Sequence, residues 1–398
     1  MNDNDIQQSG EATVPEEAVL LQAPPAALAN DKIRFSGVEL LRILAILLIC
    51  INHAVQTSQL FIDFDNVLSV GAAFLRIMRY FGQMGNILFV ICSAYFLVDS
   101  KRMKGEKALG LLFDSALISI IIFIGFLICG FKFSAMEILR QFVPDLWFIP
   151  AYVLFYVIHP LLNGAVRSMS RKSHFTFVLV CFILGAVEMF VSISGSLLNT
   201  LVGFIIVYFT VAYMKKYMQR FCESTKANAI VFCVFFGAFL LCAVLKYVFG
   251  MKFAYVKSGI VIDGFYSPLL LPALLSLFNL FNKMKFKNRV INYFASCSLF
   301  VYCFHENPLL RSIARPAFYR YFFGLNADLY FVWVLLCSFG MFLGAYIISV
   351  VYKETLHRLM AFLSKKLSEL FAKIIDFFYK KTVDNGDIAT VSDGENDK

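Results

Sequence analysis

Electrical charge is the first thing that this sequence has little of. Charged residues make up 16% of the chain and hydrophobic residues 60%, whereas soluble globular domains have about 25% and about 45–50%. The sequence also lacks a Gly-rich loop followed by Lys-Ser/Thr, a His-Glu-x-x-His pair and a Gly-x-Ser-x-Gly turn. These absences argue against a soluble protein, a nucleotide hydrolase and a zinc protease.

Two further absences concern the start of the chain and its cysteines. Residues 1–33 are acidic and lack the basic region and apolar core of a signal peptide, so we expect a disordered acidic tail there. The ten cysteines lack the close spacing of metal ligands, and nine of them lie in apolar runs. We therefore expect buried free thiols, with neither a disulfide framework nor a metal site.

What the sequence does have is a series of apolar runs about 20 residues long, the length that crosses a membrane as a helix. The runs are continuous rather than alternating, which favours helices over a β-barrel. We predict an all-α integral membrane protein with about ten transmembrane helices, near residues 37–57, 80–98, 109–131, 146–165, 174–194, 198–214, 228–250, 259–281, 293–312 and 329–351.

The basic residues indicate how these helices are oriented. With the N-terminus in the cytoplasm, the inner connections hold seventeen lysines and arginines and the outer connections hold nine. This excess predicts that the N- and C-termini are both cytoplasmic, in a multi-pass protein of the inner (plasma) membrane. It also explains the net charge of +9. We therefore expect contact with membrane lipids and not with nucleic acid.

A single membrane domain is predicted over residues 34–352. Residues 353–382 have apolar side chains every three or four positions and lysines on other faces, which predicts an amphipathic helix on the inner leaflet. Residues 383–398 are polar, and we expect them to be disordered.

The first span contains two side chains that hydrocarbon disfavours. Arg42 and His53 lie within one apolar run, where a cation and an imidazole usually mark a functional site. They are about three helical turns apart, so both project from the same face, and Glu39 falls near that face. In the predicted orientation His53 lies about 16 Å further out than Arg42. The alternatives are snorkelling by Arg42, helix packing by His53, and capping or neutralisation by Glu39.

The predicted ninth span carries a second polar group, which lies at a depth like that of His53 and comprises Tyr302, His305, Glu306 and Asn307. Pro308 follows, and because proline lacks an amide hydrogen it can break the helix and free carbonyl groups for a site. Two histidines at one level could line one cavity. The alternative is a polar kink whose side chains face the headgroups.

Four segments together resemble the membrane acyltransferase 3 family, whose members include acyl-CoA-dependent O-acetyltransferases of bacterial cell-surface polysaccharides. The first is Arg42-x10-His53 with the preceding Gly37–Leu41, and the second, Phe89–Tyr95, is similar to the family's Phe-Phe-x-Ile-Ser-Gly-Phe/Tyr. The third is Leu146–Pro150 with Tyr156 and Pro160, and the fourth, Ser298–Pro308, is similar to its Tyr-Leu-x-His segment. The resemblance covers about residues 34–350.

This resemblance implies a membrane O-acyltransferase that moves acetyl from cytosolic acetyl-CoA to a sugar hydroxyl. The acceptor would be an extracytoplasmic polysaccharide or its lipid-linked precursor. No metal is expected. His53 would be the base, and the oxyanion would be stabilised nearby. The expected catalytic group is His53, Glu39, His305, Asn307 and Tyr302; the expected donor contacts are Arg42, Lys101, Arg102, Lys104, Ser93 and Tyr95; the expected acceptor contacts are Trp147 and Glu306.

The chain departs from the family pattern at two places. Ala94 stands where the family usually has glycine, and the usual Arg-x-x-Arg of the following inner loop is absent. Two other functions stay open at this point. One is a transporter or flippase for a lipid-linked or anionic solute, which would also use buried charges. The other is an acyltransferase for a small molecule or lipid. The sequence makes no prediction of the oligomeric state.

Overall fold

The computed structural model describes residues 35–62, 69–100, 102–142, 146–191, 196–248, 264–265, 267–323 and 330–392. Within these residues the regular elements are helices and no strand is present. The predicted tail at 1–33 and residue Lys101 lie outside them. The helices are α1 (Ser36–Ser58), α2 (Val70–Met78), α3 (Phe81–Leu97), α4 (Gly105–Ile128), α5 (Ala135–Phe142), α6 (Phe148–Ser168), α7 (Arg171–Val191), α8 (Ser196–Tyr217), α9 (Gln219–Glu223), α10 (Thr225–Val248), α12 (Leu270–Asn282), α13 (Arg289–His305), the π-helical turn η2 (Leu310–Ala314), α14 (Arg315–Phe323), α15 (Tyr330–Thr355) and α16 (His357–Ser392).

Among the described residues, six helical stretches are long and apolar enough to cross a membrane. The protein is therefore helical and multi-pass, as predicted, while the count of ten spans stays a prediction. The six stretches are Ser36–Ser58, Val70–Leu97, Gly105–Ile128, Phe148–Ser168, Thr225–Leu245 and Tyr330–Thr355.

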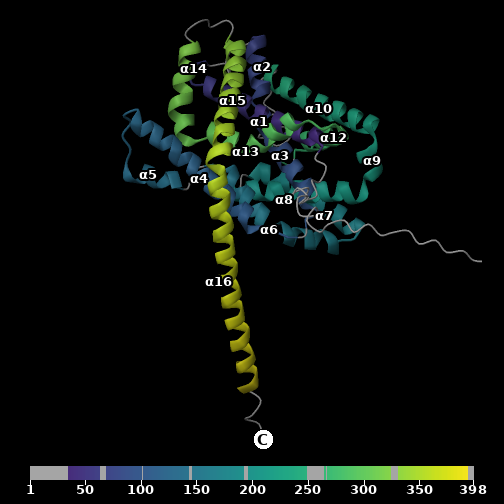
Figure 1. Ribbon diagram of the computed structural model, residues 1–398. Helices are drawn as coiled ribbons and strands as arrows, with labels where there is room; N and C mark the ends of the chain where they lie inside the picture. The colour runs from purple at the N-terminus through teal and green to yellow at the C-terminus, as the bar shows by residue number, and fades with distance from the viewer. Residues whose placement is uncertain are drawn as a thin grey trace, which may run out of the picture. The chain divides into compact units, whose positions relative to one another are not determined.

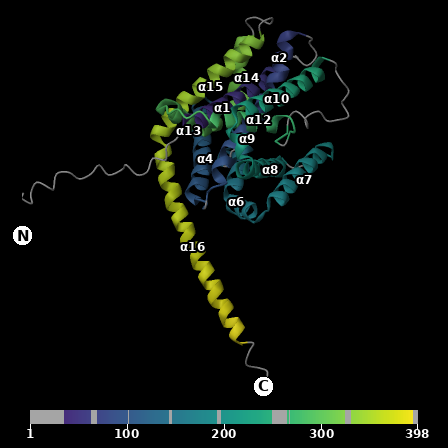
Figure 2. The same ribbon diagram turned by 90° about the vertical axis from the view of Figure 1, so that its right-hand side faces the viewer.

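Helix α1 lies at the centre of the helices that build the site. It packs against α3, α12, α13 and α15 (Figure 1). Helices α6, α7 and α8 are grouped together (Figure 2), and α8 packs against α3. Leu41, Ala45 and Ile49 recur every four residues along α1 and are buried, so they form its packed face. Two glycines allow close approach: a methyl group on Gly37 would overlap the carbonyl oxygen of Phe281, and one on Gly85 would overlap that of Ala45.

The predicted span 293–312 is not one continuous helix. α13 ends at His305, and Pro308 opens the next helical turn, where the Asn307 side chain accepts a hydrogen bond from the Leu309 amide at 3.0 Å. The break predicted from Pro308 is therefore confirmed. It frees the His305 carbonyl, which accepts a hydrogen bond from the Arg315 guanidinium.

The C-terminal helix differs from the prediction at both ends. α15 continues to Thr355, and α16 runs from His357 to Ser392, past the predicted end at 382. No proline lies between 382 and 392, so no residue there removes a helical hydrogen bond. α16 packs against α4, where His357 Nδ1 lies 3.0 Å from the buried Asp114 carboxylate. Its predicted contact with the membrane surface stays a prediction.

Candidate active site

The two polar groups of the sequence meet where α1 passes the broken end of α13. His53 Nδ1 lies 2.8 Å from Glu306 Oε2. The His53 and His305 rings are stacked, with centroids 5.2 Å apart and planes 13° from parallel. The prediction that two histidines lie at one level is confirmed in its geometry. Residues separated by about 250 positions thus form one cluster.

The Glu306 carboxylate is held by two arginines as well as by His53. Arg315 Nη2 donates to Oε2 at 3.2 Å, and Arg311 Nη1 donates to Oε1 at 3.0 Å. The Arg315 side chain is 2% exposed and that of Glu306 5%, so this ion pair is shielded from water. With neutral His53, two guanidinium groups and one carboxylate leave one positive charge beside the imidazoles. A site of this charge favours chemistry that develops a negative charge.

The contact with Glu306 distinguishes the two ring nitrogens of His53. Nδ1 lies at ion-pair distance from the carboxylate without hydrogen-bond alignment, and this contact favours the tautomer of neutral His53 with the proton on Nδ1 and the lone pair on Nε2. The His53 side chain is 12% exposed, so part of the ring is open to a reactant. The buried His305 ring has no hydrogen-bond partner at either nitrogen among the described residues. Both nitrogens are enclosed by the protein, so their hydrogen-bonding capacity is unused in this structure.

The other polar end of α1 forms a separate site. Arg42 Nη1 lies 3.2 Å from Glu39 Oε2, and Glu39 is buried. Arg42 and Ser93 line a cavity of about 260 Å³, and Tyr152 donates a hydrogen bond to the Ser93 hydroxyl at 3.2 Å. The second cation of this lining is Lys107. The sequence reasoning named its neighbours in the chain and missed it.

Three of the predicted catalytic residues lie in other surroundings than expected. Glu39 pairs with Arg42, and fourteen residues of helix separate it from His53, which is about 21 Å. Asn307 donates to Ser119 on α4 at 3.2 Å and caps the turn after it, so its amide supports the helix break. Tyr302 is buried, and its ring packs on Phe148 with centroids 5.7 Å apart.

The predicted donor and acceptor contacts are dispersed. Arg102 and Lys104 are exposed, and the Lys104 amide donates to the Tyr156 hydroxyl at 3.2 Å. Tyr95 lines a different cavity from Ser93. Trp147 packs on Phe148, beside Tyr302. Glu306 was expected to contact the acceptor, but both of its oxygens are already taken by arginines and His53. Its geometry is that of a group that orients the imidazole.

Arg311 and Arg315 are functional candidates that the sequence reasoning treated only as charges of an outer connection. The intervening turn is π-helical, which alters the angular spacing of side chains. The available signal was two arginines four residues apart directly after Glu306 and Pro308. A buried glutamate in an apolar segment requires a cationic partner, and these were the nearest in sequence.

A metal ion is a second possibility for this cluster on distance alone. One ligand atom each from His53, His305 and Glu306 lie within 4.8 Å of one another. Carboxylate and imidazole are common zinc ligands. However, an ion on Glu306 would have to displace the contacts of Arg311 and Arg315 and would add positive charge beside them. The cluster of His53, His305 and Glu306 is therefore better suited to proton transfer than to binding a metal ion.

Comparison with known proteins decides between the classes that the geometry leaves open. The model of the acyltransferase 3 family, described as an acyltransferase domain, matches residues 35–350. The chain belongs to this family. The resemblance predicted over about residues 34–350 is confirmed, and the protein is a membrane acyltransferase. No curated protein and no solved structure matches the chain. Family membership supports acyl transfer over solute transport.

Proposed function

We propose that this protein is a membrane O-acetyltransferase in which His53, oriented by Glu306, removes the proton from an acceptor hydroxyl. The observation that carries the proposal is the 2.8 Å contact between His53 Nδ1 and the buried Glu306 carboxylate. In the tautomer that this contact favours, the lone pair of Nε2 is the proton acceptor. A general base of this kind is typical of acyl transfer to a weakly acidic alcohol.

The reaction proceeds in two proton transfers on one nitrogen. Nε2 takes the hydroxyl proton as the oxygen attacks the thioester carbonyl carbon, and the carbonyl oxygen becomes negatively charged. The C–S bond then breaks, and the thiolate leaves with the proton from Nε2. The arginine pair and the His305 ring, which stacks on His53, would stabilise an oxyanion that forms next to His53. Attack by Nε2 itself, giving an acyl-histidine, uses the same nitrogen.

Acetyl-CoA is the proposed donor, and it would enter from the cytoplasm. Its thioester stands at the end of a long arm, and α1 offers a cation at one end and a base at the other. Arg42 and His53 are eleven residues apart, which is about 16 Å along the helix. Arg42 would contact the inner part of the donor. This separation allows the charged part to stay near the cytoplasm while the acyl group reaches His53.

The proposed acceptor is a sugar hydroxyl of an extracytoplasmic polysaccharide or of its lipid-linked precursor. Two observations support it: the family resemblance, and the position of His53 in the outer half of α1 under the predicted orientation. A small-molecule or lipid acceptor would use the same base. Base-labile acetyl esters on surface glycans, compared between cells with and without the protein, distinguish a glycan acceptor from these.

The decisive test measures acyl transfer by purified protein in lipid nanodiscs supplied with labelled acetyl-CoA and membrane glycolipids. We expect His53→Ala to lower transfer by at least about 10²–10⁴-fold, the usual contribution of a general base. His174→Gln is the matched control, because it also removes a buried histidine, one that contacts the Phe209 carbonyl at 2.9 Å between α7 and α8. Near wild-type transfer by folded His53→Ala protein would refute the assignment.

A further inference from the structure

A large and strongly basic cavity lies away from the histidine cluster. It has a volume of about 870 Å³ and is bounded by α3, α6, α8, α9 and α12. Its lining includes two carboxylates, Asp99 and Glu223. The cations that line it are Arg167, Lys215, Lys216, Lys283 and Lys285.

Only part of this positive charge is balanced inside the protein. Lys215 Nζ lies 2.5 Å from Asp99 Oδ2 and 4.0 Å from the centroid of the Tyr95 ring, so these groups form a wall. Lys215 and Asp99 neutralise each other, so four cations and one carboxylate, Glu223, remain. The difference, four minus one, is three positive charges facing one cavity.

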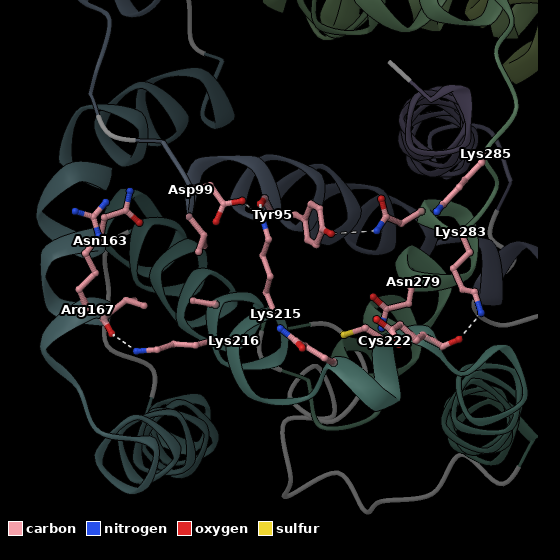
Figure 3. A pocket seen from close by; sticks show the side chains of 16 residues that line it. Tyr95, Asp99, Asn163, Arg167, Lys215, Lys216, Cys222, Asn279, Lys283 and Lys285 are labelled. Carbon is pink, nitrogen blue, oxygen red and sulfur yellow. Dashed lines mark hydrogen bonds and ion pairs between the residues drawn. The ribbon is translucent and has the colours of Figure 1, made fainter. Parts of the chain in front are cut away.

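The cations stand around the space and not in a single row. Figure 3 shows Arg167 and Lys216 on one side, Lys283 and Lys285 on the other, and Lys215 between them. Two of them are tethered at their tips by oxygen atoms: Lys216 donates to the Val166 carbonyl at 3.3 Å, and Lys283 donates to the Thr225 hydroxyl at 2.6 Å. A ligand with separated anionic groups would contact both sides at once.

Neutral hydrogen-bonding groups complete the cavity and hold its helices together. Asn163 on α6 donates to the carbonyls of Leu97 and Ser100 at 2.9 Å, which ties α6 to the end of α3. Asn282 at the end of α12 donates to the Tyr95 hydroxyl at 3.2 Å. These bonds fix the helix ends around the cavity, and Asp99, Lys283 and Lys285 are supplied by the segments directly after α3 and α12.

The cavity lies at the same end of the helices as Arg42. The ends of α3, α6, α8 and α12 meet there, and the start of α1 joins them because the Ser36 amide donates to the Phe286 carbonyl at 2.9 Å. The excess of lysine and arginine in these connections indicates that this end is cytoplasmic. A soluble cytosolic polyanion would thus reach the cavity directly.

We propose that this cavity binds the phosphate-bearing nucleotide end of the acyl donor, the adenosine 3′,5′-bisphosphate part of coenzyme A. This inference rests on the proposed function and names the part of the donor that the cavity holds. The cavity takes over the task that we first expected of Lys101, Arg102 and Lys104. Phosphate is also the charged group of lipid headgroups, so the tests below separate a nucleotide from a lipid.

The first test is direct binding of adenosine 3′,5′-bisphosphate to the full chain in nanodiscs made with a zwitterionic lipid. We expect Lys216→Gln/Lys285→Gln to weaken binding about tenfold or more, because two charge-assisted contacts are lost. Lys172→Gln/Lys226→Gln is the matched control, since both lysines are exposed, lie at the starts of α7 and α10, and are outside the cavity lining. Equal affinity of the two double variants would overturn the proposal.

The second test compares complete and truncated donors. With acetyl-CoA, the double variant Lys216→Gln/Lys285→Gln should raise KM about tenfold and leave kcat nearly unchanged. With S-acetylpantetheine, which has no nucleotide, it should match the wild-type protein. Equal loss with both donors would mean that the lysines act on folding or on chemistry, which contradicts the proposal.

The third arm replaces part of the zwitterionic lipid by phosphatidylglycerol. Unchanged nucleotide affinity supports the nucleotide assignment. Complete displacement of the nucleotide by the anionic lipid assigns the cavity to headgroups and overturns it. Binding of the nucleotide without acyl transfer from any donor would refute the proposed function while leaving the cavity assignment intact.

Discussion

The two ends of α1 face surroundings of opposite character. At the His53 end a buried carboxylate is matched by nearby cations, and the groups contact one another at 2.8–3.2 Å. At the other end, the basic cavity beside the start of α1 holds unbalanced charge on exposed side chains. Buried charges interact strongly and resist salt, whereas exposed charges are screened. The contacts of the proposed active site are thus formed before a reactant arrives, and the proposed nucleotide site would attract an anion from water.

The largest effect that this comparison predicts belongs to Glu306→Gln. The substitution removes the group that fixes the proton on Nδ1 of His53, so we expect kcat to fall on the order of 10³–10⁴-fold, as when a triad carboxylate becomes an amide. It also leaves Arg315 buried without its carboxylate, at a cost of about 3–5 kcal/mol. Acyl transfer and thermal unfolding in nanodiscs measure the two effects. A raised KM with unchanged kcat would instead support the acceptor contact predicted from the sequence.

The two arginines provide an internal comparison of buried and exposed charge. Both contact Glu306, but the Arg315 side chain is 2% exposed and that of Arg311 is 42% exposed. Arg315→Gln should destabilise the fold by about 3–5 kcal/mol, and Arg311→Gln by about 0–1 kcal/mol. Chemical unfolding of both variants checks this difference. Equal losses would mean that burial does not set the strength of these pairs.

The smallest expected effect is that of salt concentration on KM and kcat, which tests the contrast between the exposed and the buried charges at the two ends of α1. Raising potassium chloride from roughly 0.05 to 0.5 M shortens the screening length severalfold. We expect KM for acetyl-CoA to rise several-fold, because Lys216, Lys283 and Lys285 are exposed. We expect kcat to change less than about twofold, because the Arg315–Glu306 pair beside His53 is buried. Steady-state kinetics at fixed pH measure both. A kcat that falls in parallel with binding would show that the two ends are not independent.

The sequence predicted the elements of the site better than their contacts. Arg42 and His53 could be recognised because a cation and an imidazole are costly in an apolar helix, and Pro308 identified the helix break. The pairing of His53 with Glu306 could not be read from either segment, because it depends on how α1 packs on α13. The role of Arg315 depends on a π-helical turn that no residue pattern in the segment specified.

The basic cavity was missed for a different reason. Its cations come from three of the predicted inner connections. In each of these connections, the orientation of the protein in the membrane already accounts for the basic residues. Arg167, Lys216 and Lys283 line one cavity because α6, α8 and α12 pack with their ends together. Lys101 and Arg102 were expected to contact the donor because they follow the Phe89–Tyr95 segment in the chain. In the structure, the cavity with three excess positive charges takes its cations instead from α6, α8 and the segment after α12.

The close packing of α1 also limits how this protein can change over evolution. Gly37 lies against the end of α12 and Gly85 against the middle of α1, so neither contact leaves room for the helix to slide. One inserted residue between Arg42 and His53 would rotate the second relative to the first by about 100° and lengthen their separation by about 1.5 Å. Substitutions on the outer face of α1 should therefore be tolerated in relatives of this chain, whereas insertions and deletions within it should be eliminated.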